Sequence, residues 1–280
     1  MPRATSGSGR GAASLGAGAL MGGALLCGLT VVVGGSVPGT DAAATSDHPG
    51  LATRPSVQDF NAPYDGNYHF VRIRWGNGSN LRRGFRGGGP LWAHDYPRAD
   101  YNFLALVQEM TYVRTQREAS NVLTLDDPEL FRYPVAYIVE IGPWNPTDDE
   151  VAALGEYLLK GGFLIVDDFQ GNRAIRNLEY QLARAVPGAR LQFVEDDHEI
   201  FDSFFRIVPD KVIPPYGFDP PLWLGLYEDN DPAKRLMVMV NANNDIAEYW
   251  EYSDLGYYPV ALSNEAYKLG INYVVYGLTH

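Results

Sequence analysis

Two short acidic groups in the sequence have the residue types needed for acid–base or metal chemistry. Asp167 and Asp168 are adjacent, and His198 lies within a second run of acidic residues at 196–199. Carboxylates and an imidazole can transfer protons during hydrolysis, and they are also ligands for divalent cations. Asp168 and His198 are therefore candidate catalytic residues, and these two together with Asp167 are candidate metal ligands. Their spacing matches no diagnostic metal motif, so we predict no bound cofactor, with a divalent metal as the alternative.

Polar and aromatic groups elsewhere in the chain could contact a ligand. Residues 92–96 place His94 and Asp95 between aromatic rings, and residues 243–245 hold two asparagines and an aspartate. Each group also has a structural explanation, because the rings could pack in the core and Asn and Asp suit turns. In the same way, an Asp at a strand end often caps the next helix, and His198 could orient a loop. The candidate ligand-binding residues are Trp75, Asp95, Asp167, Asp168, His198, Asn244 and Asp245.

The sequence argues against several common chemistries. Its only cysteine, Cys27, lies in the N-terminal apolar stretch, so the rest of the chain has no thiol nucleophile, disulfide or thiolate zinc site. There is no G-x-S-x-G, and the loop at 82–89 lacks both G-x-G-x-x-G and the P-loop lysine. We interpret that loop as solvated. The net charge of −12 repels phosphate backbones, so nucleic acid is not an expected partner.

The candidate residues follow segments that have the pattern of buried strands. Residues 135–141 and 163–166 are almost continuously apolar, as expected of strands that are covered on both faces. Between them, Thr147 and Glu150 have the spacing of a capping box, which predicts a helix, and a glycine pair would end that helix. A strand, a helix and a strand at this spacing predict a parallel sheet.

In an open parallel sheet, ligands bind beyond the carboxyl ends of the strands. The sequence also predicts strands at 68–75, 190–194 and 235–241. Four polar groups would then follow strand ends, at residues 75–77, 167–168, 196–199 and 243–245. We therefore predict that these groups converge on one cleft. The other predicted elements are strands at 121–125 and 222–227, a helical turn at 127–130, and helices at 101–114, 177–186 and 265–278.

The N-terminus has the pattern of an export signal. Arg3 and Arg10 precede an uncharged, glycine-rich apolar stretch at about 15–33, and the alanines at 42–44 supply the small residues that signal peptidase prefers. The predicted organisation is a signal peptide at 1–44, a polar linker at 45–66 and a single domain at 67–280. The apolar stretch approaches the length that spans a bilayer, so an uncleaved signal anchor is the alternative. We expect a periplasmic or extracellular protein whose membrane contact, if any, is through this segment.

A set of segments spread over the predicted domain carries a family resemblance. The segments are Asp127-Pro128-Glu129-Leu130-Phe131, Gly161-Gly162-Phe163-Leu164 through Asp167-Asp168, Asp197-His198-Glu199-Ile200-Phe201, Asn244-Asp245 and the ending Leu269-Gly270-Ile271-Asn272-Tyr273-Val274-Val275-Tyr276-Gly277-Leu278-Thr279. Together they resemble the bacterial family catalogued as domain of unknown function 4159. The resemblance implies a three-layer, flavodoxin-like α/β fold with a mostly parallel sheet, similar to class I glutamine amidotransferases. It implies no established reaction.

Two functional hypotheses follow from the resemblance. Amidotransferase folds place a cysteine nucleophile at a tight turn after a strand, and this domain has no cysteine, so we expect no glutaminase activity. Related domains without the nucleophile act as binding or assembly modules. Our first hypothesis is therefore a non-catalytic module of the bacterial envelope, whose partner is an envelope protein or a small polar ligand. The alternative is a hydrolase, with or without a metal, that uses Asp167, Asp168 and His198.

Overall fold

The most apolar segments of the chain form the centre of one sheet. The structure, a computed structural model, describes residues 61–76, 89–117, 120–217 and 219–280. The central strands β3 (Val135–Val139), β4 (Phe163–Phe169) and β7 (Leu236–Ala242) are buried along their whole lengths. They pair in parallel, β3 with β4 and β4 with β7. Because both faces of these strands are covered, their sequences do not alternate between apolar and polar residues.

The complete sheet has seven strands in the order β2-β1-β3-β4-β7-β6-β5. Its other strands are β1 (Val71–Ile73), β2 (Asn121–Leu123), β5 (Gln192–Phe193) and β6 (Leu222–Tyr227). The first five in this order are parallel, whereas β6 is antiparallel to β7 and β5 is antiparallel to β6. The parallel part has the flavodoxin-like strand order. The predicted α/β fold with a mostly parallel sheet is confirmed.

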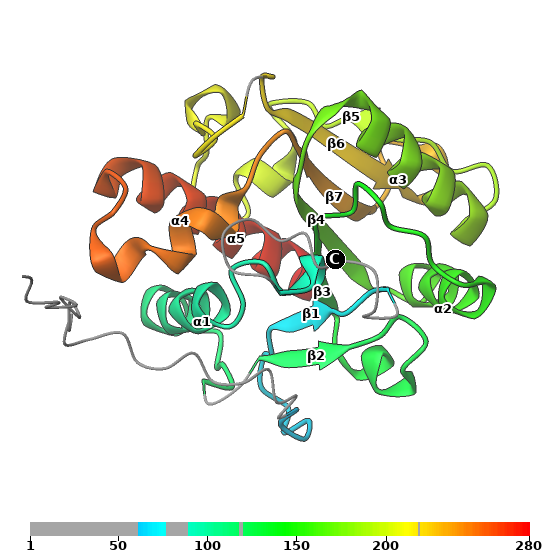
Figure 1. The fold of residues 1–280 in the computed structure, drawn as a ribbon, viewed down its shortest axis with the longest axis horizontal. Coiled ribbons are helices and arrows are strands. Elements are labelled where there is room, and N and C mark those ends of the chain that lie inside the picture. Colours follow the sequence, from blue (N-terminus) through cyan, green and yellow to red (C-terminus); the bar gives the residue numbers. More distant parts are fainter. Residues whose placement is uncertain (1–60, 77–88, 118–119, 218) are drawn as a thin grey trace, which may run out of the picture. The chain divides into compact units, whose positions relative to one another are not determined.

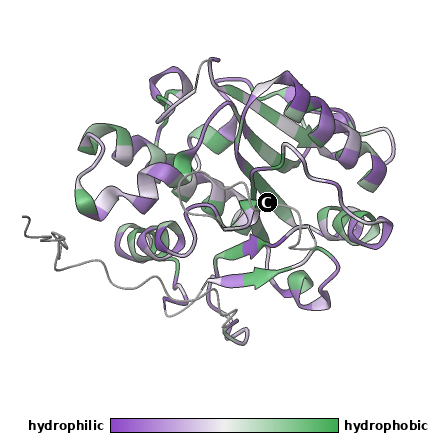
Figure 2. Cartoon of the chain, in the orientation of Figure 1, coloured by the Kyte–Doolittle hydropathy of each residue, from purple (hydrophilic) through white to green (hydrophobic). Residues whose placement is uncertain are grey.

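Helices cover the sheet on both faces and make three layers (Figure 1). One face carries α1 (Arg98–Met110), α4 (Ile246–Glu251) and α5 (Val260–Thr279), which pack on one another over one core. The other face carries α2 (Asp148–Leu159) and α3 (Gly171–Ala185) over a second core. Figure 2 shows apolar strands between helices whose outward sides are polar, as burial of apolar surface requires.

The helix between β3 and β4 begins as its sequence predicts. Thr147 Oγ1 accepts a hydrogen bond from Glu150 N at 3.2 Å, and the Glu150 carboxylate accepts one from Thr147 N at 2.8 Å, which completes the capping box. After the helix, Gly161 has a φ of +107°, a conformation that favours glycine. At Gly162 a side chain would collide with the ring of Tyr157, 2.5 Å away. Both glycines are therefore needed to bring the chain from α2 straight into β4.

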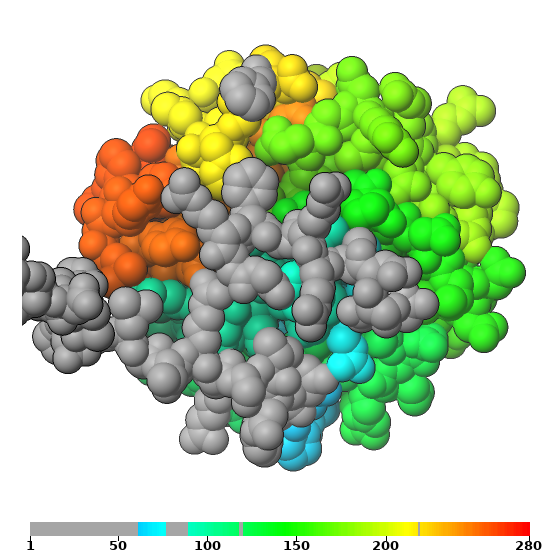
Figure 3. Space-filling model, viewed as in Figure 1, coloured from blue at the N-terminus to red at the C-terminus, as the bar shows by residue number. Residues whose placement is uncertain are grey.

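Helices α1 and α4 are distant in the sequence and lie side by side (Figures 1 and 3). The rings of Phe103 and Trp250 stack with centroids 4.2 Å apart, and Asn102 Nδ2 donates to Trp250 O at 2.9 Å. An exposed ion pair joins Arg98 to Asp254 at 2.7 Å. Together these contacts join α1, which begins shortly after Asp95, to α4, which begins directly after Asp245.

Several element boundaries differ from the predictions. Strand β4 continues through the two aspartates at 167–168 instead of ending before them, and α3 and α5 begin earlier than expected. The short helix α4 was not predicted, because six residues contain too few turns to show a helical period. Residues 1–60 and the loop residues 77–88 lie outside the described residues, so the predicted signal peptide does too. Within the part that is described, no helix is both long and apolar enough to cross a membrane.

Candidate functional site

A bulge in β4 gives two adjacent aspartates, Asp167 and Asp168, different surroundings. Val166 pairs with Val240 and Phe169 with Ala242, so two residues of β4 face a single residue of β7 between these pairs. Asp167 stays in the core, whereas Asp168 adopts a left-handed backbone with a φ of 51°. The Asp168 carboxylate therefore leaves the normal strand alternation and meets the side chain of His94.

Left-handed residues other than glycine gather at the carboxyl edge of the sheet. Glu140 (φ 55°), Asp168 (φ 51°) and Asn243 (φ 59°) lie at the ends of β3, β4 and β7, and Asp95 (φ 61°) precedes α1. Backbone hydrogen bonds tie these ends together, since Glu140 N donates to Asp168 O and Asn243 N donates to Phe169 O, both at 3.0 Å. Each such residue costs on the order of 1 kcal/mol or more. The carboxyl edge is therefore a region of stored backbone strain.

A buried arginine in β1 holds the loop that carries His94 and Asp95. Arg72 Nη1 donates to the backbone oxygens of Trp92 and His94, at 3.3 and 3.0 Å. Its other nitrogens form a two-pronged ion pair with Asp100 in α1, at 3.2 and 2.5 Å, and both side chains are fully buried. Arg72 thus connects β1, the loop and α1, so the position of Asp95 is set by the fold.

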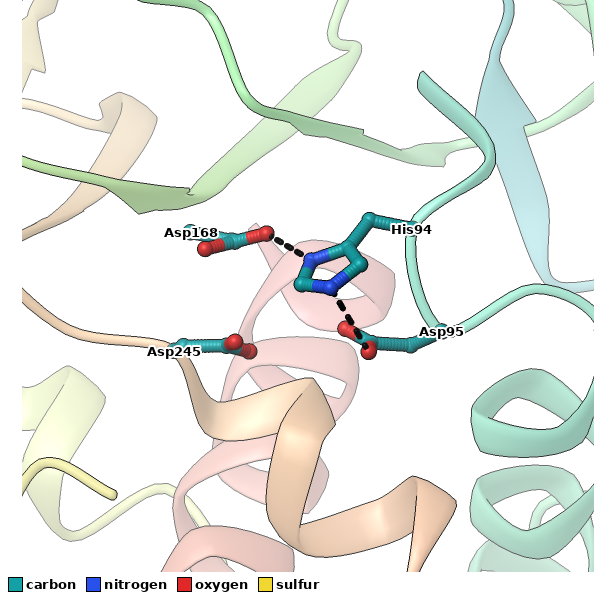
Figure 4. A group of neighbouring side chains, drawn as sticks. All are labelled: His94, Asp95, Asp168 and Asp245. Atoms are coloured by element: carbon teal, nitrogen blue, oxygen red, sulfur yellow. Dashed lines mark hydrogen bonds and ion pairs between the residues drawn. The ribbon is translucent and has the colours of Figure 1, made fainter. Parts of the chain in front are cut away.

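The site itself consists of His94, Asp95, Asp168 and Asp245 (Figure 4). One side-chain nitrogen or oxygen from each residue lies within 4.8 Å of those from the other three. His94 Nδ1 is 2.5 Å from Asp168 Oδ2, and His94 Nε2 is 3.8 Å from Asp95 Oδ1. Asp245 caps α4 by accepting from Glu248 N at 2.9 Å. In Figure 4 the four side chains, from three separate parts of the chain, point toward one another.

The Asp95 carboxylate is buried without a hydrogen-bond donor. Only 4% of the residue is exposed, and neither of its oxygens accepts a hydrogen bond from the described residues. Burial raises the pKa of Asp95 well above its usual range, and the Asp245 carboxylate adds to the increase, while His94 opposes it. A buried carboxylate normally gains donors or a counter-ion, because leaving it without them costs several kcal/mol.

The other members of the site have shifted pKa values for related reasons. Burial raises the pKa of Asp168 well above its usual range, with a further contribution from Asp245. Burial, together with Asp167, raises the pKa of Asp245 to about 7. For His94, burial lowers the pKa, but the carboxylates of Asp95 and Asp245 outweigh it and the net shift is upward. The four groups therefore compete for protons in a small volume.

More oxygen atoms surround the four residues. Tyr216 Oη donates a short hydrogen bond to Asp245 and a longer one, 3.4 Å, to Asp168. Glu248 and Glu251, in α4, each have a carboxylate oxygen within 4.8 Å of Asp95. Glu140 is half-buried, and burial raises the pKa of its carboxyl. These described residues thus add negative charge to the site.

Three of the predicted residues near this edge are held by the fold itself. Asp167 accepts hydrogen bonds from Tyr137 Oη, Asn241 Nδ2 and Ile246 N, at 2.8, 3.1 and 3.0 Å. Trp75 is buried, and its Nε1 donates to Val139 O at 2.8 Å. Asn244 is buried beside Asp245, whose backbone N donates to Asn244 Oδ1 at 2.9 Å, while Asn244 Nδ2 has no partner among the described residues. Asp167 and Trp75 are therefore explained by structure alone.

His198 does not join the site, contrary to the prediction of a single cleft. Its Nδ1 accepts from Ile200 N at 3.1 Å and caps a short 3-10 helix, Glu199–Phe201. Its ring is 6.0 Å from that of Tyr276, whose Oη accepts from Leu236 N at the start of β7. Seven strand residues span about 20 Å, so His198 lies at the amino edge of the sheet. The chain turns back after β5, and the carboxyl-end rule does not extend to residues beyond such a turn.

The sequence analysis listed Asp95, Asp168 and Asp245 as candidates. It placed His94 in a polar and aromatic group that could contact a ligand but did not list it, and it did not mention Glu140, whose charge acts on His94. His94 had one visible signal, its position directly before Asp95 in the segment that follows the Gly/Arg-rich loop. Glu140 had none, because nothing in the sequence indicates its left-handed turn. Tyr216 reaches the site from a segment without regular secondary structure, so only the tertiary structure reveals it.

Comparison with models of known protein families gives a match. A family model described as domain of unknown function (DUF4159) matches residues 70–278. This range includes all four clustered residues and every strand of the sheet. A search of curated proteins found no match to the chain. The family description names no reaction, ligand or partner, so the chemistry has to be argued from the site.

Proposed function

The chain belongs to the domain of unknown function (DUF4159) family, and from the site geometry we propose that it is a binding module that holds a polar ligand at the carboxyl edge of its sheet. One observation carries the proposal. The Asp95 carboxylate is buried among Asp168, Asp245 and His94, and neither of its oxygens has a donor from the described residues. Such an arrangement lowers the stability of the ligand-free fold, so we infer that it is retained for a ligand.

The position of the site supports the same proposal. The sheet order reverses between β1 and β3, and ligands in flavodoxin-like folds bind beyond the carboxyl ends of strands at such a reversal. Glu140 follows β3, and the loop with His94 and Asp95 lies between β1 and α1. Nearby, the buried Asn244 Nδ2 is a donor with no partner among the described residues. The carboxylates of the site thus offer acceptors and His94 offers an imidazole, which suits a polar ligand.

We place this module in the bacterial envelope, where its ligand would be a small polar molecule or part of an envelope protein. The support is the N-terminal sequence, with Arg3 and Arg10 before an apolar stretch and alanines at 42–44. The absence of cysteine outside that stretch supports a module that has no glutaminase activity.

The proposal predicts that Asp95 stabilises a complex and destabilises the free protein. In the full chain without ligand, Asp95→Asn should raise the free energy of unfolding by about 1–3 kcal/mol, because Asn places no charge in the buried site. Urea denaturation at neutral pH measures this change. The matched control is Asp127→Asn, which keeps an N-cap acceptor for Glu129 N and should leave stability nearly unchanged. If Asp95→Asn instead destabilises the protein, Asp95 has a structural role and the proposal fails.

A hydrolase is the second candidate, and the contact between His94 and Asp168 favours it. Nδ1 of His94 lies 2.5 Å from Asp168 Oδ2, which is the arrangement of a general base and the carboxylate that orients it. This pair takes the place of the pair Asp168 and His198, which the fold separates. Asp168→Asn would reduce turnover of a chromogenic ester or phosphate about 100-fold or more if the pair is catalytic. A binding module would show no turnover to lose.

A further inference from the structure

We propose that the carboxyl edge binds a divalent transition-metal cation through His94, Asp95 and Asp245. Asp168 would orient the imidazole of His94 from its other nitrogen. This inference rests on the proposed function and deepens it, because it names the ligand that the site takes first. A second polar ligand or partner group would then bind through the cation.

The charge of the site is the first argument. Three aspartates lie within 4.8 Å of one another, and each is at most 4% exposed. Arg72, which holds the loop of His94 and Asp95, is already paired with Asp100 and with two backbone oxygens. His94 is the only basic side chain in the group. Buried carboxylates in proteins are either paired or bound to a metal, and one imidazole cannot pair with three of them.

The unpartnered oxygens of Asp95 are the second, independent argument. The other two aspartates do have hydrogen bonds. Asp245 accepts from Tyr216 Oη and from Glu248 N. Asp168 accepts from His94 Nδ1 and from Tyr216 Oη. Both oxygens of Asp95 are buried and have none from the described residues. In Figure 4 the Asp95 carboxylate points toward His94 and toward the space shared with Asp245. A metal ion there would supply the bonds that this carboxylate lacks.

The two nitrogens of His94 have different surroundings. Nδ1 is engaged by Asp168 Oδ2 at 2.5 Å. Nε2 lies on the other side of the ring, 3.8 Å from Asp95 Oδ1. Metal-binding histidines usually donate their second nitrogen to a carboxylate, which fixes the ring and its tautomer. Asp168 is placed for that role, which leaves Nε2 for the metal.

The donor set selects the class of cation. Imidazole nitrogen suits Zn²⁺, Fe²⁺ and related ions, whereas Mg²⁺ and Ca²⁺ prefer sets made only of oxygen. One nitrogen with two or more carboxylates, and no thiolate, suits Zn²⁺, Mn²⁺ or Fe²⁺. We expect Zn²⁺ and Mn²⁺ to bind more tightly than Mg²⁺.

The test is calorimetric titration of the full chain with Zn²⁺, Mn²⁺ and Mg²⁺ after removal of metals with a chelator. About one equivalent of Zn²⁺ or Mn²⁺ should bind with high affinity, and it should raise the melting temperature. Co²⁺ provides an optical check, because ligation by His94 should give visible absorption bands that surface binding does not.

Variants separate the site from general attraction of cations to an acidic protein. Asp95→Asn should abolish the specific binding, and Asp168→Asn should weaken it about 10- to 100-fold because only the orientation of His94 is lost. The matched control is Asp197→Asn, which removes an exposed carboxylate beside a histidine, His198, outside the site. It should bind the cation as the natural chain does.

Two results would overturn the inference. One is no specific binding of any of the three cations by the natural chain, and the other is equal binding by Asp95→Asn. In either case, the free energies of unfolding of Asp95→Asn and of the natural chain, both without metal, then test the proposed function. If Asp95→Asn is still more stable than the natural chain, the carboxyl edge is a site for a ligand other than a cation. If it is less stable, the binding-site proposal fails as well.

Discussion

The two edges of the sheet each hold a histidine next to an aspartate, and the two pairs differ in burial and in hydrogen bonding. At the amino edge, Asp197 is exposed and His198 caps a short helix. At the carboxyl edge, Asp95 is buried without a donor from the described residues, and the two ring nitrogens of His94 face the carboxylates of Asp168 and Asp95. The same residue types therefore make a local structural cap where donors are available and a strained site where they are not.

The electrostatics of the two histidines differ in the same way. Burial lowers the pKa of His198, and its acidic neighbours Glu199 and Asp197 do not reverse the shift. At His94 burial also lowers the pKa, but Asp95 and Asp245 reverse the direction. Burial therefore favours the neutral form of His198, whereas the surrounding carboxylates favour the charged form of His94. What distinguishes the site from the cap here is the number of buried carboxylates around the imidazole.

The largest expected effect comes from removing the support of the carboxyl edge. Arg72→Met should lower the free energy of unfolding by about 3–5 kcal/mol, because Asp100 stays buried without its partner. The control, Arg98→Met, breaks the exposed pair with Asp254 and should cost about 1 kcal/mol or less. Chemical denaturation of both variants measures the difference.

A double variant sharpens this prediction. Arg72→Met with Asp100→Leu should recover much of the stability, because no charge then remains buried. It should still impair cation binding, since the backbone oxygens of Trp92 and His94 have lost their donor. If the double variant binds the cation normally, Arg72 does not position the loop.

The next effect compares the two adjacent aspartates of the β4 bulge. Asp167→Asn should cost about 1–3 kcal/mol, because Asp167 accepts from three donors and an amide would turn a donor of its own toward one of them. Asp168→Asn should change stability by less than about 1 kcal/mol, since the amide oxygen can still accept from His94. Urea denaturation of the metal-free proteins decides this. Equal losses would show that Asp168 is as structural as Asp167.

The sequence predicted the parts of the fold that depend on local pattern. The capping box of α2, the apolar runs of β3 and β4 and the strand β6 have signals within a few residues of themselves. The bulge has no such signal, because two adjacent aspartates look alike until β7 pairs against them. The rule that ligands bind beyond the carboxyl ends of parallel strands located the polar groups after β4 and β7 correctly. It was wrong for His198, because the chain reverses after β5 and takes His198 to the other edge.

The site was predicted only in part for a related reason. Asp95, Asp168 and Asp245 are on three segments that parallel pairing and the packing of α1 on α4 bring together. The role of His94 depends on Arg72, more than twenty residues earlier in the chain, which holds its backbone oxygen. A contact of that kind leaves no periodicity or spacing that can be recognised in one sequence.

The smallest expected effect belongs to the amino edge, where the imidazole acts as a cap. His198→Ala should cost about 1 kcal/mol at about pH 8, because Ile200 N loses its acceptor. His198→Asn keeps an acceptor and should cost less.

The two variants should differ from the natural chain in pH dependence as well as in stability. Burial holds the pKa of His198 below its usual value of 6.5, so unfolding takes up a proton below that pH. The natural chain therefore loses stability as the pH falls below 6.5, and this contribution should disappear in both variants. Urea denaturation at about pH 8 and about pH 5.5 checks both parts. Cation binding at the carboxyl edge should be the same in all three proteins, and a change in it would mean that the two edges are coupled through the sheet.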